Sequence, residues 1–179
     1  IPPILPISSG RSVIPVTLVG VARSSIAVRS EHMLNLVIVA QLAATAVMFG
    51  AIWIVQLLVY PSFEDVAASV SPEAWRRFHA RHTGRITWIV GPAMLVEACA
   101  ALWLLITLPS QIWVVLNVLG AGLIALVWVV TIIVSSIHHS RLSNEPNLEI
   151  AHRLVQWNWV RTIAWTSRLL IVVIMTIQV

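Results

Sequence analysis

Four long apolar runs constrain the fold of this chain more than any other feature. They lie at about 33–60, 86–108, 112–137 and 153–179 of the 179 residues. Each has the length, roughly 20 residues, that a helix needs to cross a ~30 Å hydrocarbon core. Only 10% of the residues are charged, whereas a soluble domain has roughly 25%. The sequence therefore predicts an all-α fold, a transmembrane four-helix bundle.

The first 32 residues differ from the rest of the chain. Three prolines occupy the first six positions, and the apolar stretch 13–22 is too short to span a bilayer. We interpret 1–32 as a disordered or spurious N-terminal extension. The transmembrane domain is then 33–179, which begins at Met33.

Turn-forming residues separate the four spans. Pro61 is expected to end the first span, because a proline drives the residue before it out of helical geometry. Ser71-Pro72-Glu73 has the character of a helix start. It predicts a short helix before the second span, which could continue into that span. The turn 109–111 makes the second and third spans a hairpin, and the loop 138–150 precedes the fourth.

All eleven basic residues are arginines, and they set the expected orientation. The turn 109–111 has none. Six of them lie in or beside the loops 62–85 and 138–150: Arg76, Arg77, Arg81, Arg85, Arg141 and Arg153. Basic residues favour the cytoplasmic side. Both long loops are thus expected on the cytoplasmic face of the cell (plasma) membrane, with the C-terminus outside.

The expected partners follow from the same composition. The first expected partner is the lipid bilayer. Other membrane subunits, or further copies of the chain in a homo-oligomer, are the second. Because the arginines lie beside apolar segments, we read them as topology signals and lipid contacts. No nucleic-acid partner is expected.

Two ionisable residues lie inside the apolar runs. Glu97 is eleven residues before Leu108, and Arg168 is eleven before Val179. At 1.5 Å per residue, both are about 16 Å from the same end of the bundle. A lone charge there costs at least about 2.5 kcal/mol, so we expect the two to pair. The pair would either only join two helices or form part of a proton or substrate path.

A polar stripe extends this intramembrane site along the fourth span. Asn158, Arg161, Trp165 and Arg168 follow one another at intervals of three or four residues. Such spacing puts them on one helix face. We therefore add Asn158 and Arg161 to Glu97 and Arg168 as candidate site residues. Other polar residues of the spans are assigned to interhelical hydrogen bonds: Gln41, Gln56, Asn117, Thr131 and Ser135.

Histidines gather at the predicted cytoplasmic ends of the spans. His79 and His82 precede the second span, His139 follows the third, and His152 begins the fourth. Converging imidazoles can ligate a transition metal or, as an axial pair, a b-type haem. No H-E-x-x-H or C-x-x-C motif sharpens this hypothesis. The alternative is that each histidine bonds lipid phosphate or backbone.

The sequence predicts no reaction, because it contains no Gly-rich phosphate loop and no G-x-S-x-G elbow. Three functions stay open. The first is haem or transition-metal binding through the histidines. The second is a small proton-coupled transporter that uses the Glu97–Arg168 pair, and the third is an accessory subunit of a larger membrane complex.

Four motifs carry a family resemblance: Tyr60-Pro61-x-Phe63, Phe78-His79-x-x-His82, Pro92-x-Met94-x-x-Glu97 and Asn158-Trp159-x-Arg161-Thr162-x-Ala164-Trp165-x-x-Arg168. They resemble a family of uncharacterised small bacterial integral membrane proteins with four predicted spans. The resemblance covers the chain from about Met33 to the end. It implies the topology and the choice of residues, and it supplies no reaction or cofactor.

Overall fold

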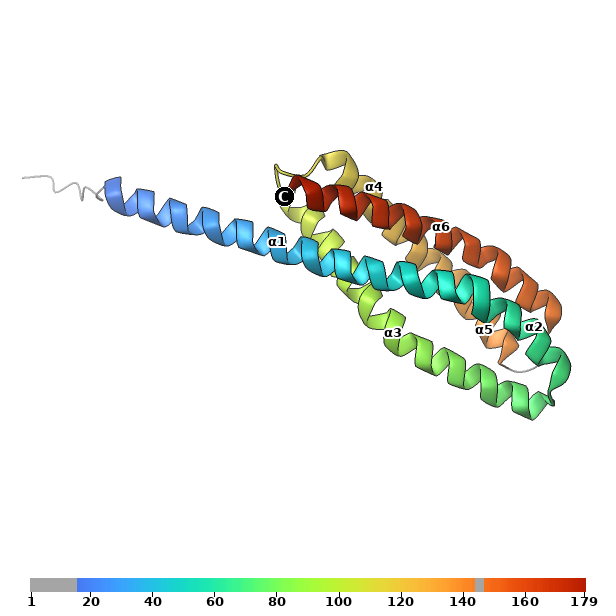
Figure 1. Ribbon diagram of the computed structural model, residues 1–179. Helices are drawn as coiled ribbons and strands as arrows, with labels where there is room; N and C mark the ends of the chain where they lie inside the picture. Colours follow the sequence, from blue (N-terminus) through green and yellow to red (C-terminus); the bar gives the residue numbers. More distant parts are fainter. Residues whose placement is uncertain (1–15, 144–146) are drawn as a thin grey trace, which may run out of the picture. The chain divides into compact units, whose positions relative to one another are not determined.

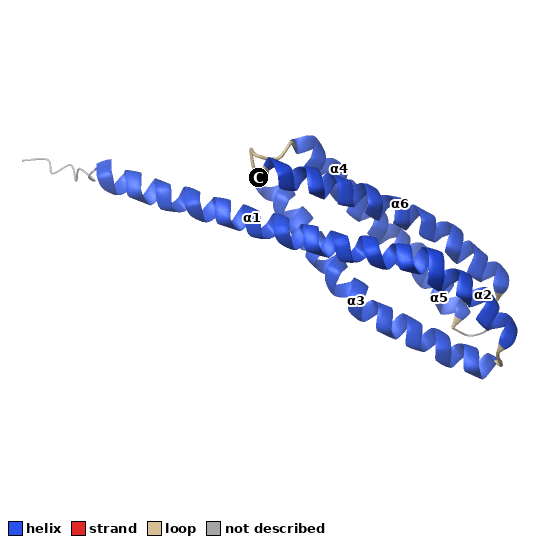
Figure 2. Ribbon diagram, in the orientation of Figure 1, coloured by secondary structure: helices blue, strands red, loops and turns tan. Residues whose placement is uncertain are grey.

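The computed structural model describes residues 16–143 and 147–179, with side chains from Val28 onward except that of Glu64. The described residues are almost all helical and contain no strand (Figures 1 and 2). The elements are α1 (Val16–Ile54), the π-helix η1 (Val55–Val59), α2 (Tyr60–Ser69), α3 (Pro72–Thr107), α4 (Val114–Val129), the π-helix η2 (Val130–Ser135), α5 (Ser136–Leu142) and α6 (Leu148–Gln178). The chain divides into two units, Ile1–Met33 and Leu34–Val179.

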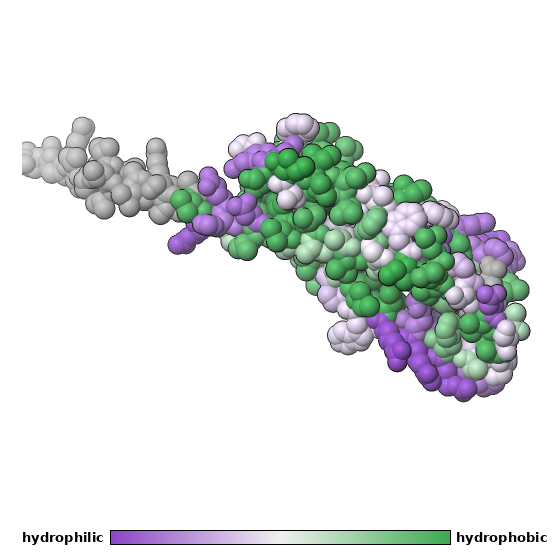
Figure 3. Space-filling view, in the orientation of Figure 1, coloured by the Kyte–Doolittle hydropathy of each residue, from purple (hydrophilic) through white to green (hydrophobic). Residues whose placement is uncertain are grey.

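Four helical segments are long and apolar enough to cross a membrane: Val28–Ser69, Pro72–Thr107, Val114–Leu142 and Leu148–Gln178. The predictions of an all-α chain and of four such helices are thereby confirmed. In the second unit they pack as a bundle, in which α4 and α6 contact each other, α3 contacts α4, and α2 contacts α6. Apolar side chains cover its middle, and polar ones gather where α2 and α3 meet (Figure 3).

The first long helix continues through Pro61, where the sequence predicted its end. A proline removes one helical hydrogen bond and clashes with the carbonyl four residues earlier. The wider turns of η1 precede Pro61, and the Tyr60 N–H donates to the Val55 oxygen within them. A π-bulge of this kind lets a helix absorb such a residue. Tyr60 and Phe63 consequently face the bundle, and both are buried.

Two further predicted boundaries can be compared with the structure. The helix expected to start at Pro72 continues into the second span, as the sequence allowed, because α3 runs without interruption to Thr107, with the Ser71 hydroxyl accepting from the Ala74 N–H. The third helix does not end near 137 but continues through η2 and α5 to Leu142. The loop expected at 138–150 is therefore shorter, since α5 ends at Leu142 and α6 begins at Leu148. Residues 144–146 of this loop are not among the residues that the structure describes.

The structure describes part of the N-terminal segment. Residues 16–32 belong to α1 and are helical, and the interpretation of 1–32 as a disordered or spurious extension stays a prediction. Residues 1–15 lie outside the described part of the chain. The boundary between the two units falls after Met33, the residue at which the four-helix domain is predicted to begin.

Candidate functional site

An aromatic cluster at the end of the bundle positions three of the predicted histidines. The Trp75 side chain is 0% exposed, and its Nε1–H donates to the Leu142 carbonyl oxygen at 2.8 Å. This bond ties α3 to α5. Phe63 packs edge-on against Trp75 and against the rings of His79 and His82. The imidazoles are therefore held by rings from α2 and α3.

A continuous hydrogen-bonded chain runs through this cluster. The Tyr60 hydroxyl lies 3.2 Å from His139 Nε2. His139 Nδ1 is 3.1 Å from His79 Nε2, and His79 Nδ1 is 3.2 Å from the Ser143 hydroxyl. Both ring nitrogens of His79 and of His139 are engaged. The extension of the third helix to Leu142 makes this possible, because it places His139 and Ser143 one helical turn apart on the same face.

His82 contacts the rings of Phe63 and His139, and His152 lies on another helix, α6. The ring centroids of His82 and His139 are 6.5 Å apart, and His152 is exposed near the start of α6. Among the described residues, no group of three or more His, Cys, Asp or Glu is placed to hold a metal ion. Metal or haem binding by His79, His82, His139 and His152 stays a prediction.

Arg161 and Asn158 join the same end of the bundle from α6. Arg161 Nη1 donates to Asn158 Oδ1 at 3.2 Å, and Asn158 Nδ2 donates to Gln56 Oε1 at 2.8 Å. The Arg161 side chain lines the same cavity as Tyr60 and His139. Its Nε is buried and has no partner among the described residues. The interhelical bond expected of Gln56 is thus confirmed, and Arg161 keeps one N–H donor for a ligand.

A cavity of about 240 Å³ lies beside these residues. Its polar wall contains Tyr60, His82, His139 and Arg161 together with the hydroxyl residues Thr83, Thr87, Thr131, Ser135 and Ser136. The Thr131 hydroxyl is buried without a partner among the described residues, although the sequence predicted an interhelical bond for it. The cavity therefore offers two unused hydrogen-bonding groups inside the bundle, the Thr131 hydroxyl and the Arg161 Nε–H.

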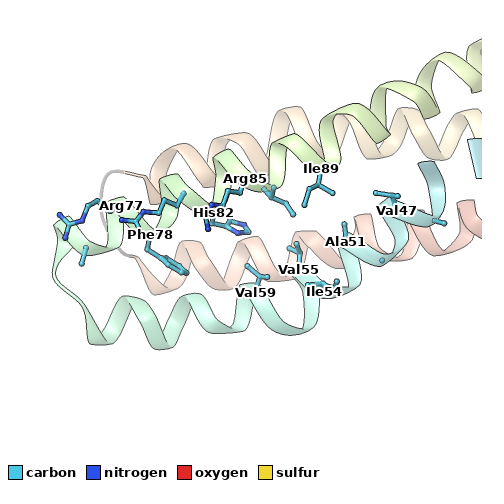
Figure 4. Close-up of a pocket in the computed structure, with 15 residues that line it drawn as sticks. Val47, Ala51, Ile54, Val55, Val59, Arg77, Phe78, His82, Arg85 and Ile89 are labelled. Atoms are coloured by element: carbon cyan, nitrogen blue, oxygen red, sulfur yellow. The ribbon is translucent and has the colours of Figure 1, made fainter. Parts of the chain in front are cut away.

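A larger groove of about 880 Å³ lies next to the cavity, between α1–η1 and α3 (Figure 4). The wall on α1 and η1 is apolar, from Ala46 to Val59. The wall on α3 carries Arg77, Arg81 and Arg85 at intervals of one helical turn. Four residues line both spaces: Ala51, Val55, His82 and Ile86. The groove thus adjoins the polar cavity at His82.

The charged side chains that line the groove and the cavity are all positive. Arg77, Arg81 and Arg85 line the groove, and Arg161 lines the cavity. No Asp or Glu occurs among the described residues that line either space. Such a site attracts anionic groups and groups that accept hydrogen bonds. Tyr60, Thr131 and the groove residues of α1 were not among the sequence candidates, because an apolar run does not reveal which of its faces meets a cavity.

Glu97 and Arg168 meet inside the bundle, as their equal depths predicted. Arg168 Nε and Nη2 each lie 3.2 Å from Glu97 Oε2. The side chains are 0% and 2% exposed. Glu97 Oε1 is buried without a partner among the described residues, as are the amide groups of Gln41 and Asn117, for which interhelical bonds were expected. The pair is therefore formed, and one carboxylate oxygen remains unused.

No family model, curated protein or solved structure matches this chain.

Proposed function

We propose that this chain is a multi-pass membrane protein whose α2–α3 and α5–α6 connections face the cytoplasm. The four apolar helices support insertion, as do the many large apolar side chains on the surface, such as Leu102, Ile106 and Val118 at 58%, 73% and 56% exposure. Apolar surface of this extent is rare on soluble monomers. The arginines at the start of α3 support the orientation.

We propose further that the protein binds a single-chain membrane amphiphile, whose oxygen-bearing head enters the cavity and whose apolar chain lies in the groove. The observation that carries this proposal is the junction at His82, where an apolar groove meets a polar cavity. Ligand sites commonly combine apolar walls with a few placed polar groups. The lining arginines complement an anionic or hydrogen-bond-accepting head.

The direction of the groove fits an amphiphile in one bilayer leaflet. Its arginine end, at Arg77 and Arg81, lies in the first turns of α3, near the end of the bundle. The other end of the groove is apolar and is lined by Val47 and Ile89 (Figure 4). From Arg77 to Ile89, α3 rises about 18 Å at 1.5 Å per residue, and the cavity joins the groove at His82, about 10 Å before Ile89. A head in the cavity and a chain that runs from His82 toward Ile89 therefore lie within one leaflet, whose depth is about half of a ~30 Å hydrocarbon core.

Amphiphile binding uses the histidines differently from the predicted haem or metal site. A metal ligand must offer a free imidazole nitrogen. Both nitrogens of His79 and His139 already take part in hydrogen bonds within the protein. These bonds favour a role in a polar network, and His82 is the histidine that faces both ligand spaces.

Two glycine substitutions test amphiphile binding with a matched control. Gly50 lines the groove, and a Cβ there would meet no atom within 4 Å. Gly50→Leu therefore fills the groove without a clash, whereas Gly122→Leu, at an equally open position on α4, leaves the groove unchanged. With tritiated hexadecanoic acid and hexadecanol as probes, Gly50→Leu should weaken binding of whichever probe binds by about tenfold, which corresponds to ~1.4 kcal/mol. Equal affinities in both variants would contradict the proposal.

Glu97 favours a second candidate function, that of a proton-coupled carrier. Its free oxygen Oε1 is buried beside the Arg168 pair and has no partner among the described residues. Ionisable residues at such depth often form proton paths. In proteoliposomes with an imposed pH gradient and a trapped pH dye, Glu97→Gln should abolish proton uptake. Uptake at the unmodified rate in that variant would reject this function.

A further inference from the structure

We propose that the head of the bound amphiphile is a carboxylic acid, and that Tyr60, His139, His79 and Ser143 carry its proton from the cavity to the surface. This inference rests on the proposed amphiphile binding and names the class of ligand. It starts from the position of the hydrogen-bonded chain. Tyr60 and His139 line the cavity, His79 is 1% exposed, and Ser143 is exposed at the end of the bundle.

Each member of the chain can both donate and accept a hydrogen bond. A neutral imidazole has one N–H and one bare nitrogen, and a hydroxyl has one hydrogen and two lone pairs. The three connecting distances are 3.2, 3.1 and 3.2 Å. A proton entering one imidazole nitrogen can therefore leave from the other. The chain is unbranched from Tyr60 to Ser143 and crosses a packed aromatic layer that contains Phe63 and Trp75.

The hydrogens of this chain all point in one direction. The Ser143 hydroxyl donates to the His139 carbonyl oxygen at 2.8 Å, so its oxygen accepts from His79 Nδ1–H. His79 Nε2 is then bare and accepts from His139 Nδ1–H. His139 Nε2 is bare in turn and accepts from the Tyr60 hydroxyl. In this arrangement each nitrogen and oxygen of the chain has one role, and the hydrogens are set to carry a proton away from the cavity.

The charges around the chain favour an anion in the cavity. Tyr60, His82, His139 and Arg161 line the cavity, and no Asp or Glu occurs among its described lining residues. Arg161 is the permanent cation among them, and its buried Nε–H lacks a partner among the described residues. A carboxylate oxygen would accept from this group in a charge-assisted hydrogen bond. Arg161 and Tyr60 both line the cavity, so a carboxylate beside Arg161 can also lie beside the Tyr60 hydroxyl.

A carboxylic acid needs such a chain, whereas an alcohol does not. In hydrocarbon the acid is protonated, because the charged form is costly to bury. Beside Arg161 the carboxylate is favoured instead. Tyr60 gives its proton to His139 as His139 passes one to His79, His79 passes one to Ser143, and Ser143 releases one to water. The acid O–H bond then breaks, and its proton restores the Tyr60 hydroxyl, which leaves the carboxylate bound and one proton in solution.

Proton release on binding tests this inference. The purified protein in neutral-lipid nanodiscs, at about pH 6, where burial keeps the free acid protonated, is mixed with hexadecanoic acid and a soluble pH dye. Hexadecanol is the uncharged control probe. We expect about one proton per bound acid, none with the alcohol, and affinity for the acid at least about tenfold higher, since charge-assisted hydrogen bonds are stronger than neutral ones.

Two conservative variants separate the relay from binding. His79→Gln keeps one donor and one acceptor but cannot take a proton at one atom and release it at another, and Tyr60→Phe removes only the hydroxyl. In folded protein of either variant, as judged by circular dichroism, we expect the acid to bind and its proton to leave at least about 10²-fold more slowly, as for the loss of a positioned proton-transfer group. Ser140→Ala, at an exposed position on the same helix as His139, should change neither quantity.

The outcomes distinguish the relay from the amphiphile site. Proton release at the unmodified rate in both variants would overturn the relay. Equal affinity for the two probes without proton release would overturn the choice of a carboxylic acid and leave amphiphile binding intact. Failure of both probes to bind would reject the proposed function itself.

Discussion

Arg168 binds Glu97 through two donors directed at one oxygen, since Nε and Nη2 both lie 3.2 Å from Oε2. The guanidinium reaches this position because Gly120 on α4 has no side chain. A Cβ at Gly120 would clash with Arg168 Nη1. The pair therefore depends on a third helix, and α4 contributes the space in which α3 and α6 are joined.

Gly120→Ala should destabilise the bundle. An alanine normally stabilises a helix relative to glycine, by up to about 1 kcal/mol. Here the methyl group would displace the guanidinium, and overpacking of this kind costs about 1–3 kcal/mol. Gly122→Ala, two residues along α4 at a position with nothing within 4 Å of the added Cβ, should be neutral or stabilising. The melting temperatures in detergent, compared between the two variants, check this prediction.

Breaking the buried pair from either side should be costly. Glu97→Gln and Arg168→Gln each leave one charge without its counterion, which costs about 3–5 kcal/mol in buried pairs. The double variant removes both charges and should recover part of that stability. Denaturant unfolding of the three variants gives the coupling energy. Additive effects, with no recovery in the double variant, would mean that the pair makes no net contribution.

Trp75→Phe should loosen the end of the bundle that holds the histidines. It removes the Nε1–H that donates to the Leu142 carbonyl. Loss of a buried hydrogen bond that leaves its partner unsatisfied costs about 1–3 kcal/mol. Trp88→Phe on the same helix is the control, because Trp88 is 83% exposed. Hydrogen exchange of α5 should accelerate in the first variant only, and equal exchange in both would refute the role of this bond.

The two ends of the bundle should face opposite sides of the membrane. Single cysteines at Ser69, Ser110 and Ser140, all exposed, can be introduced after Cys99→Ala removes the native thiol. A membrane-impermeant maleimide applied to intact cells should label Ser110→Cys alone. Labelling of all three positions from outside would contradict the topology, and labelling of only the other two would invert it.

The four apolar helices and the Glu97–Arg168 contact could be predicted because each follows from a strong local signal. Apolar runs of membrane length leave few alternative folds. The burial cost of a charge requires a partner at the same depth, and the two eleven-residue offsets supplied one.

The helix boundaries and the ligand spaces could not be predicted in the same way. Pro61 is a strong local breaker, but the π-turns of η1 accommodate it, and their formation depends on packing against α2 and α6. The position of His139 on a helix followed from a similar extension through η2. The groove depends on how far α1 and α3 stand apart, and the composition of neither helix encodes that spacing.

Photo-crosslinking tests the central claim, that an amphiphile occupies the groove and the adjoining cavity, most directly. A hexadecanoic acid that carries a diazirine on its chain is added to the protein in nanodiscs, activated by light, and its adducts are mapped by mass spectrometry. Our account predicts adducts on residues 46–59 and 77–89, which form the two walls of the groove, and their loss in Gly50→Leu but not in Gly122→Leu. Adducts spread evenly over lipid-facing residues of α4 such as Val118 and Leu126, with no preference for the groove, would contradict it.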